Sequence, residues 1–307
     1  MEKISVVIPS FNEEKNIPQI TAALNSAFQK IQYEQEYIFV DDGSTDKTWD
    51  TIVTLAKKNP NVHGITLSRN FGKERAILAG VRAVKTKAAI VMDADLQHPP
   101  EVVLEIIEKW KETNCDIVHA IKTERANSNE SLSDSILIRL FYSLYKLGTG
   151  TSLKGASDFK LLNQRAIEEY SKLSERDLFF RGLVPWLGFH QETVTYKVAK
   201  RFHGTGKWSL FKRITTAIFA ITSFSVLPLQ LVTFIGCLFL LGAILLGGFT
   251  FYDWWTGAAV EGFTTVILLL LIVGATLMIS LGIIGQYIAR IYDEVKGRPT
   301  YIIKEEV

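Results

Sequence analysis

The order of apolar and polar positions divides the chain into two unlike parts. In the first part, the short apolar runs ISVVIP, YIFVDD, VHGITLS, AAIVMDAD and DIVHAI alternate with stretches of helical periodicity over 16–30, 46–58, 72–85 and 100–112. Strands that alternate with helices are typical of a mostly parallel, doubly wound sheet with helices on both faces. The pattern therefore predicts an α/β domain over residues 1–205.

The second part is dominated by two uncharged intervals, one between Arg213 and Asp253 and one between Glu261 and Arg290. A helix that spans a bilayer needs roughly 20 mainly apolar residues, and each interval contains enough. Two buried core helices are the alternative, but they would need a much larger soluble domain to cover them. The predicted segments are helices at about 228–252 and 263–288, which form a transmembrane hairpin over 228–288, and a basic tail over 289–307.

An amphipathic stretch, WSLFKRITTAIFAITSFSVLPLQ, joins the two parts. Its apolar residues favour one helix face, and Lys207, Lys212 and Arg213 stand near its start. Such a segment is typical of a helix that lies in the membrane interface. We expect an interfacial helix over 206–227, with a core helix of the soluble domain as the alternative.

Charge placement gives an orientation. The loop DWWTGAAVE between the predicted spans carries two acidic residues and no Lys or Arg, whereas basic residues stand on both outer flanks. The positive-inside rule then places the α/β domain and both termini in the cytoplasm, at the cytoplasmic membrane if the source is bacterial. Cys115 lies in the polar part and Cys237 inside a predicted span, so no disulfide is expected. The net charge of +2 does not suggest nucleic-acid binding.

Polar clusters follow three of the predicted strands: PSFNE at 9–13, DDGSTD at 41–46 and DAD at 93–95. In doubly wound sheets, ligands bind beyond the carboxyl ends of the strands. Each cluster has a simpler interpretation, as helix caps or as a solvated acidic turn. Three acidic strand ends in one crevice instead favour Mg²⁺ or Mn²⁺ shared with a diphosphate, because these ions prefer oxygen ligands. A glycine-rich dinucleotide fingerprint and a P-loop are both absent.

Seven motifs in order resemble one enzyme family: VVIPSFNEEKNI, VDDGSTDKT, LSRNFGKERAILAG, MDADLQHPPE, DFKLLN, RGLVPWLGF and ITSFSVLPLQL. Together they closely resemble the polyprenyl-phosphate glycosyltransferases, inverting enzymes of the GT-A fold that include dolichol-phosphate mannose synthases and bactoprenol glucosyltransferases. The match runs over essentially the whole chain. Each motif alone is only modestly specific, whereas the ordered set is highly specific.

The resemblance implies a donor site. Lys122 stands where many relatives have arginine, and because lysine cannot form a bidentate fork on phosphate, Arg125 is the alternative there. Asp158, in SDF where relatives usually have GDF, is expected to orient the acceptor or the sugar, with a general base as the alternative. The implied nucleotide-sugar contacts are Pro9, Phe11, Glu13, Val40, Asp42, Asp93, Ala94, Lys122, Arg201 and Lys207. The implied metal positions are Asp93, Asp95 and Gln97, and the implied catalytic positions are Asp95 and Asp158.

The resemblance also implies an acceptor-phosphate site made of Arg125, Arg139 and Ser143. Arg139 and Ser143 lie at i and i+4, so on a helix both would face the same side. The alternatives are a solvated arginine on an amphipathic helix for Arg139, and generic contact with anionic lipid headgroups for Lys207. The histidines that form no recognisable metal cluster, and receive no role, are His98, His119 and His203.

The implied function is the metal-dependent, inverting transfer of one sugar from a nucleotide sugar to a polyprenyl phosphate in the bilayer. A phosphate monoester has a second pKa of about 6, so this nucleophile is already largely ionised. Processive polysaccharide synthases would need a multi-helix channel and a QxxRW motif. Glucose from UDP-glucose is the first expectation, before mannose from GDP-mannose and UDP-linked amino sugars. The alternative from another class is a membrane-bound nucleotide-sugar sensor or scaffold, and the oligomeric state stays open, a homo-oligomer included.

Overall fold

The structure, a computed structural model, describes residues 2–123, 155–176, 178–197, 227–257 and 262–307. The chain divides into two compact units, which are described separately. The first unit contains the sheet and includes residues 298–307, and the second contains two long helices.

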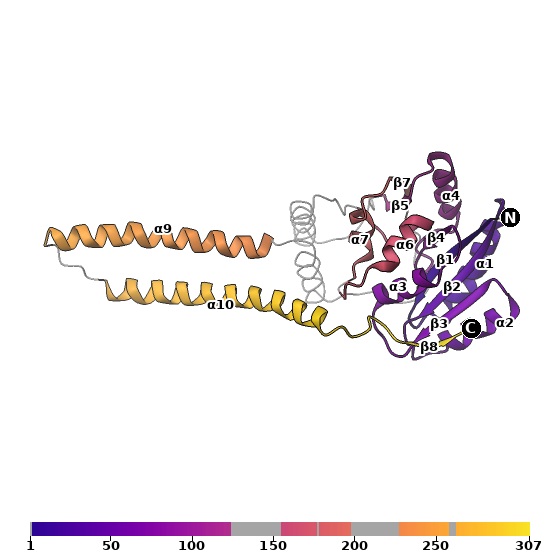
Figure 1. Cartoon of the computed structure of the whole chain (residues 1–307), viewed down its shortest axis with the longest axis horizontal. Coiled ribbons are helices and arrows are strands. Elements are labelled where there is room, and N and C mark those ends of the chain that lie inside the picture. Colours follow the sequence, from indigo (N-terminus) through magenta and orange to yellow (C-terminus); the bar gives the residue numbers. More distant parts are fainter. Residues whose placement is uncertain (1, 124–154, 177, 198–226, 258–261) are drawn as a thin grey trace. The chain divides into compact units, whose positions relative to one another are not determined.

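Strands and helices alternate regularly in the first unit (Figure 1). The predicted α/β class is confirmed, and the observed elements up to β5 agree closely with the predicted ones. These elements are β1 (Glu2–Ser10), α1 (Asn16–Phe28), β2 (Tyr33–Asp41), α2 (Thr48–Lys58), β3 (Val62–Leu67), α3 (Lys73–Ala83), β4 (Ala88–Val91), α4 (Glu101–Thr113) and β5 (Ile117–Lys122). The remaining elements of this unit are β6 (Lys160–Asn163), α6 (Gln164–Lys172), α7 (Phe180–Trp186), β7 (Gln191–Tyr196) and β8 (Ile303–Glu306).

The strands form one eight-stranded sheet in the order β7-β5-β6-β4-β1-β2-β3-β8. β1 pairs in parallel with β2 on one side and with β4 on the other, so the chain builds outward from β1 in both directions. In doubly wound sheets, ligands bind beyond the strand ends at such a switch point. The edge between β1 and β4 is therefore the first place to look for a site.

β6 is a strand that the sequence does not predict. Its four residues, KLLN, are too few to show a clear alternation, and they form a strand because both neighbours, β4 and β5, pair with them. β6 runs antiparallel to both. It therefore begins at the edge where β4 and β5 end, and the residues just before Lys160 lie at that edge.

Helices cover both faces of the sheet (Figure 1). α1, α2 and α4 contact one another or the strands on one face, while α3, α6 and α7 pack together on the other. On the first face, Ile17, Ile20 and Leu24 recur at helical spacing and are fully buried in the main core. On the second face, Gly80 of α3 allows a close approach, because a Cβ there would lie 2.4 Å from Cγ1 of Val7.

The segment expected as a basic tail over 289–307 contains a strand that the sequence does not predict. Ile303–Glu306 form β8, which pairs antiparallel with β3 and extends the sheet. Gly64 and Val307 exchange two backbone hydrogen bonds of 2.8 and 2.9 Å, and the indole N–H of Trp49 donates to Glu305 at 3.2 Å. Without β8 one side of β3 would have unpaired backbone groups, which a sheet edge must otherwise protect.

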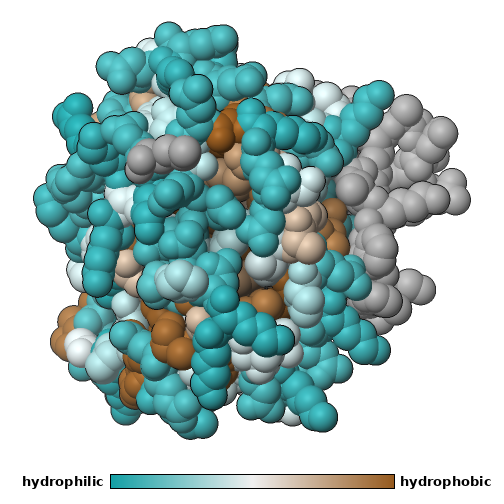
Figure 2. Space-filling model, turned by 90° about the vertical axis from the view of Figure 1, so that its right-hand side faces the viewer, coloured by the Kyte–Doolittle hydropathy of each residue, from teal (hydrophilic) through white to brown (hydrophobic). Residues whose placement is uncertain are grey.

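The second unit consists of α9 (Leu227–Trp255) and α10 (Phe263–Val295), and α10 extends past its predicted end at 288. Both helices contain a segment long and apolar enough to cross a membrane, Val232–Asp253 and Ile272–Val295, and neither segment is buried against protein. This exposure disfavours the alternative of two core helices. By contrast, the face of the first unit in Figure 2 is largely hydrophilic. The interfacial helix expected over 206–227 lies outside the described residues, apart from Leu227 at the start of α9.

Candidate active site

The candidate active site lies at the carboxyl ends of β1, β2 and β4, where β6 begins. The loops after β1 and β2 are linked there by hydrogen bonds between side chains and backbone. Asn12, with a left-handed φ of 56°, donates its backbone N–H to Ser44 Oγ at 2.9 Å. The backbone N–H of Glu13 donates to Thr48 Oγ1 at 2.8 Å, and Asp46 Oδ1 accepts from the Thr48 N–H at 2.9 Å, which fits the helix-cap interpretation of Asp46. The two loops therefore form one linked rim.

Three of the residues predicted to contact the nucleotide differ sharply in exposure. Phe11 is 43% exposed on this rim and can offer its ring to a ligand. Pro9 is buried, and Val40 is fully buried with its side chain facing α3, since a Cβ at Gly80 would lie 2.9 Å from Val40 Cγ2. Only the backbone of Val40 can face a ligand.

Asp42 holds the loop that leads into α3. Its carboxylate accepts hydrogen bonds from the backbone N–H groups of Phe71 at 2.7 Å and Gly72 at 2.9 Å. Burial raises the pKa of Asp42, although these two donors oppose the shift. Gly43, with φ of 66°, makes the approach possible, because a Cβ there would lie 2.4 Å from the backbone carbon of Arg69. The β2 and β3 loops are thus fixed to each other.

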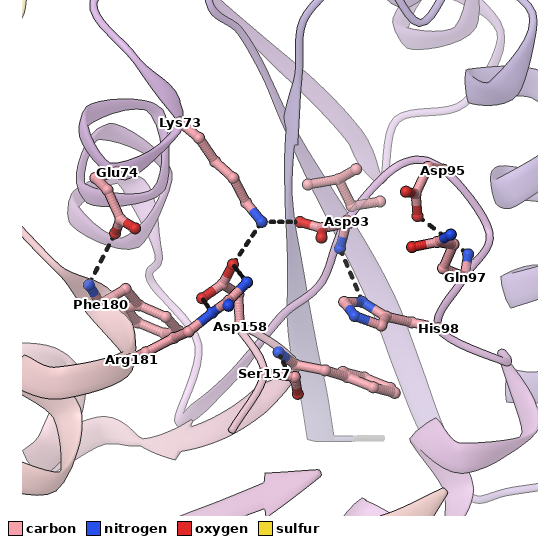
Figure 3. A network of polar contacts seen from close by, with 12 residues as sticks. Lys73, Glu74, Asp93, Asp95, Gln97, His98, Ser157, Asp158, Phe180 and Arg181 are labelled. Carbon is pink, nitrogen blue, oxygen red and sulfur yellow. Dashed lines mark hydrogen bonds and ion pairs between the residues drawn. The ribbon is translucent and has the colours of Figure 1, made fainter. Parts of the chain in front are cut away.

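The DAD motif forms a tight turn after β4, which we call the acidic turn and define as Asp93–Gln97. The backbone N–H of Gln97 donates to Asp95 Oδ1 at 3.0 Å, and Leu96 takes a left-handed φ of 58°. Ala94 is buried at 2% exposure, so its methyl group faces the core. Asp93, Asp95 and Gln97, the predicted metal positions, lie together in this turn (Figure 3).

Asp158 is surrounded by cations (Figure 3). The Lys73 ammonium lies 2.5 Å from Asp93 Oδ1 and 2.5 Å from Asp158 Oδ2, so it bridges the two carboxylates. Arg181 donates from Nε to Asp158 Oδ1 at 2.7 Å and from Nη2 to Oδ2 at 2.9 Å. The Asp158 side chain is only 3% exposed. Lys73 of α3 and Arg181 of α7 therefore fix the loop before β6 to the acidic turn.

These contacts set the ionisation of the site. Burial alone would raise the pKa of Asp158, but Lys73 and Arg181 outweigh it and hold that pKa far below its usual range. The same lysine outweighs burial at Asp93, whose pKa is lowered. Burial and then the negative charge of Asp158 raise the pKa of Glu74 to about 7, and Glu74 accepts the Phe180 N–H at 2.8 Å. Asp158 is thus a firmly ionised, fully engaged carboxylate, which is a poor general base.

The donor set of the acidic turn fits a cation only in part. Among the residues that the structure describes, no three His, Cys, Asp or Glu side chains cluster to enclose a metal ion. Asp93 is engaged with Lys73, and Asp95 accepts from Gln97. Mg²⁺ is commonly held by one or two carboxylates together with substrate phosphates. The turn therefore fits a divalent cation whose remaining ligands come from a diphosphate.

Of the basic residues predicted to contact donor or acceptor, the structure describes only Lys122. Lys122 lies at the end of β5, where burial lowers the pKa of its ammonium and nearby Arg181 adds to the effect. The predicted residues that lie outside the described part of the chain are Arg125, Arg139, Ser143, Arg201 and Lys207.

Four residues of the site were not predicted: Lys73, Glu74, His98 and Arg181. Lys73 and Glu74 stand in the motif LSRNFGKE, and Arg181 opens RGLVPWLGF, so the motifs contained the signal. His98 directly follows the acidic turn, and its Nδ1 accepts the Asp93 N–H at 3.2 Å. From the sequence, His98 stands out only as a possible metal ligand, and it belongs to no recognisable metal cluster.

Comparison with known proteins gives a consistent family. The family described as Glycosyl transferase family 2 matches residues 5–171. The chain is 40% identical over 304 residues to a Bacillus subtilis (strain 168) protein named as the glycosyltransferase CsbB, covering 98% of this chain and 91% of that one. It is 37% identical over 306 residues to the SfII prophage-derived bactoprenol glucosyl transferase of Shigella flexneri, covering 99% and 98%.

A solved structure supports the fold. Mannosyl-3-phosphoglycerate synthase from Rubrobacter xylanophilus superposes with a TM-score of 0.52 at 14% identity, over 72% of this chain and 73% of that one. At that identity the likeness shows a shared GT-A-like fold and nothing about substrates.

Proposed function

Because the chain belongs to glycosyl transferase family 2 and is a glycosyltransferase, we propose that it transfers one hexose from a nucleotide sugar to a polyprenyl phosphate, with inversion at the anomeric carbon. The observation that carries this proposal is the extent of the match. Relatives named bactoprenol glucosyl transferase align over 99% of the chain, so the alignment includes the two long apolar helices as well as the sheet. Their names support glucose as the sugar, and the acidic turn supports a donor that carries a diphosphate, for which UDP-glucose is our first choice.

On the donor side, the linked rim and the acidic turn face the same sheet edge. The exposed ring of Phe11 is available to stack on a base, and Glu13 and Asp42 belong to the loops that would surround the ribose. Asp95, with Asp93 and Gln97 in the same turn, would hold Mg²⁺ or Mn²⁺, and such an ion would offset the negative charge of the departing diphosphate. Lys122, Arg201 and Lys207 would add positive charge around it.

On the acceptor side, the reaction needs little base catalysis. An oxygen of the lipid phosphate forms a bond to the anomeric carbon while the bond to the nucleoside diphosphate breaks. The phosphate is already ionised at neutral pH, so no proton must be removed. Asp158, held ionised by Lys73 and Arg181, fits a role in orienting groups better than a role as a proton acceptor. Arg139, Ser143 and Arg125 would bind the acceptor phosphate.

The membrane supplies the acceptor. The two apolar helices, α9 and α10, would hold the enzyme in the bilayer where a polyprenyl chain is dissolved. The acidic loop between them and the basic flanks support a topology with the sheet and both termini in the cytoplasm, where nucleotide sugars are made.

The test offers radiolabelled UDP-glucose, GDP-mannose and UDP-N-acetylglucosamine to the purified full chain, with and without polyprenyl phosphate. We expect label from UDP-glucose to enter the organic phase only when lipid phosphate is present. If label from GDP-mannose enters the organic phase instead, the proposed reaction class stands and the sugar is mannose. If no donor labels the lipid, the proposal is wrong.

A further inference from the structure

His98 is buried directly behind the acidic turn. Its side chain is 1% exposed, and Nδ1 accepts a hydrogen bond from the backbone N–H of Asp93 at 3.2 Å (Figure 3). Nδ1 must be unprotonated to accept this bond, so the imidazole proton resides on Nε2. This hydrogen bond links Asp93, the first residue of the acidic turn, to His98, the residue that directly follows the turn.

The turn needs such support because its own geometry is unfavourable. Leu96 has a left-handed φ of 58°, a conformation that costs free energy for any residue with a Cβ. Leu96 packs against the main core, and two hydrogen bonds also hold the turn: the Gln97 N–H bond to Asp95 at 3.0 Å, and the Asp93 N–H bond to His98. The first bond occupies an oxygen of Asp95, a proposed metal ligand. The second bond uses the backbone N–H of Asp93 and so occupies no carboxylate oxygen of Asp93 or Asp95.

The same imidazole ring belongs to an aromatic cluster, which we define as His98, Phe159 and Tyr196. His98 stacks on Phe159 with centroids 4.9 Å apart and an interplanar angle of 15°. Tyr196 meets both rings edge-on, each at a centroid distance of 5.8 Å. Phe159 directly follows Asp158 in the chain, so the ring that supports the acidic turn also packs against the neighbour of the Arg181-bound carboxylate.

We propose that His98 is a positioning residue for the metal–diphosphate site, which acts by accepting the Asp93 N–H and so keeps the acidic turn in its binding conformation. The inference rests on the proposed role of that turn. Packing and positioning are separable functions of this one side chain: the ring fills the core between Phe159 and Tyr196, and the acceptor nitrogen orders the turn. Two substitutions divide them, because each preserves one function and removes the other.

His98→Phe keeps a ring but removes the acceptor, so the Asp93 N–H loses its partner. His98→Asn keeps an acceptor close to the position of Nδ1 but removes the ring. We expect His98→Phe, which keeps the ring packing, to melt closer to the wild type than His98→Asn does and to bind Mn²⁺–UDP about five- to tenfold more weakly, the scale of one hydrogen bond that shifts the population of competent turns. We expect His98→Asn to melt at a lower temperature and to keep most of the affinity.

The measurement is a calorimetric titration of UDP in the presence of Mn²⁺, beside a thermal melt, on the full chain in detergent. Asp95→Asn provides the reference for loss of the metal site. If affinity follows melting temperature in both His98 variants, His98 is a packing residue only and the inference is wrong. If both variants bind normally while Asp95→Asn does not, the inference fails and the proposed site stands. If Asp95→Asn also binds normally, the proposed metal site itself fails.

Discussion

Arg181 holds Asp158 through two parallel hydrogen bonds, Nε to Oδ1 at 2.7 Å and Nη2 to Oδ2 at 2.9 Å. A planar fork of this kind fixes the plane of the carboxylate as well as its charge. Lys73 takes the remaining approach to Oδ2 and extends the contact to Asp93. The orientation of Asp158 therefore depends on a helix, α7, whose far end, Trp186, lies exposed on the surface.

Removing the fork should reduce catalysis more than donor binding. Loss of a charge-assisted hydrogen bond of about 1.5–3 kcal/mol predicts a drop in kcat/KM of roughly tenfold to a hundredfold for Arg181→Met. Arg181→Lys should recover only part of it, since charge returns without the fork. A double-mutant cycle with Asp158→Asn should give a coupling of about 0.5–3 kcal/mol. Arg165→Met, on the exposed face of α6, is the matched control. Additive effects of Arg181 and Asp158 would contradict the pairing.

Metal removal should stop the reaction. We expect EDTA to abolish transfer and Mg²⁺ or Mn²⁺ to restore it, because in the proposed site the acidic turn shares a cation with the diphosphate. Asp95→Asn should lower turnover about a hundredfold or more, the scale of losing one strong transition-state stabiliser. Asp50→Asn, exposed on α2, should leave turnover unchanged. Full activity of Asp95→Asn in EDTA would rule out the metal.

Arg139 lies outside the described residues, so the prediction of its role depends on the sequence alone. We expect Arg139→Ala to reduce kcat/KM for lipid phosphate by roughly tenfold to a hundredfold and to leave nucleotide-sugar binding nearly unchanged. Arg139→Lys should restore part of the loss. Paired titrations of donor and acceptor on the same purified variant decide the matter. A weakened donor titration with an intact acceptor titration would move Arg139 to the donor side.

Topology can be tested by labelling the loop between α9 and α10. Thr256 is exposed just after α9 and is a better cysteine site than Gly257, whose φ of 74° would strain any side chain. With Cys115 and Cys237 replaced by serine, Thr256→Cys should react with an impermeant maleimide added outside intact cells, with any outer membrane permeabilised. Reaction only after lysis would reverse the proposed orientation.

Acid should destabilise the first unit through His119. This side chain is buried between Lys160, whose Nζ lies 2.8 Å from Nδ1, and Gln191, whose Oε1 lies 2.7 Å from Nε2. Burial lowers the pKa of His119 to about 3. The unfolded chain therefore binds a proton that the folded chain does not, and stability is lost as pH falls from about 6.5 toward 3. At pH 5 the expected loss is about 2 kcal/mol.

Denaturant unfolding in detergent between pH 7.5 and 5 measures this loss. His119→Gln cannot titrate, so its stability should fall less steeply over the same interval than that of the wild type. Parallel curves for the two proteins would show that His119 does not supply the proton uptake.

The elements that sequence predicts well are those that local pattern determines. β1 to β5 and α1 to α4 have apolar runs or helical periodicity long enough to stand alone. β6 and β8 each have four residues and depend on partners far away in the chain, so no local signal marks them. The end of α10 is another case, because the apolar pattern that predicts a membrane span stops near 288 while the helix continues to Val295.

For the site, the strand-end rule correctly brings the loops after β1, β2 and β4 to one edge, and the motif resemblance to a glycosyltransferase family is confirmed. The strand-end rule does not identify Lys73 and Arg181, the basic residues that bind Asp158. Lys73 and Asp158 are 85 positions apart, and Arg181 and Asp158 are 23 apart, so their pairing emerges only from the packing of α3 and α7 around β6. Ion pairs between residues that lie far apart in the chain produce no periodic pattern in the sequence.

The pairing of β8 with β3 also imposes an order on folding. Trp49 and its partner Glu305 are 256 positions apart, and both long helices are translated between them. While the ribosome makes α9 and α10, the nascent sheet presents the open side of β3, the kind of edge at which incomplete chains associate. A stop codon just after α10 would release a protein with both helices and most of its sheet, yet with that edge permanently open. β8 can therefore cover this side of β3 only after both long helices have been translated.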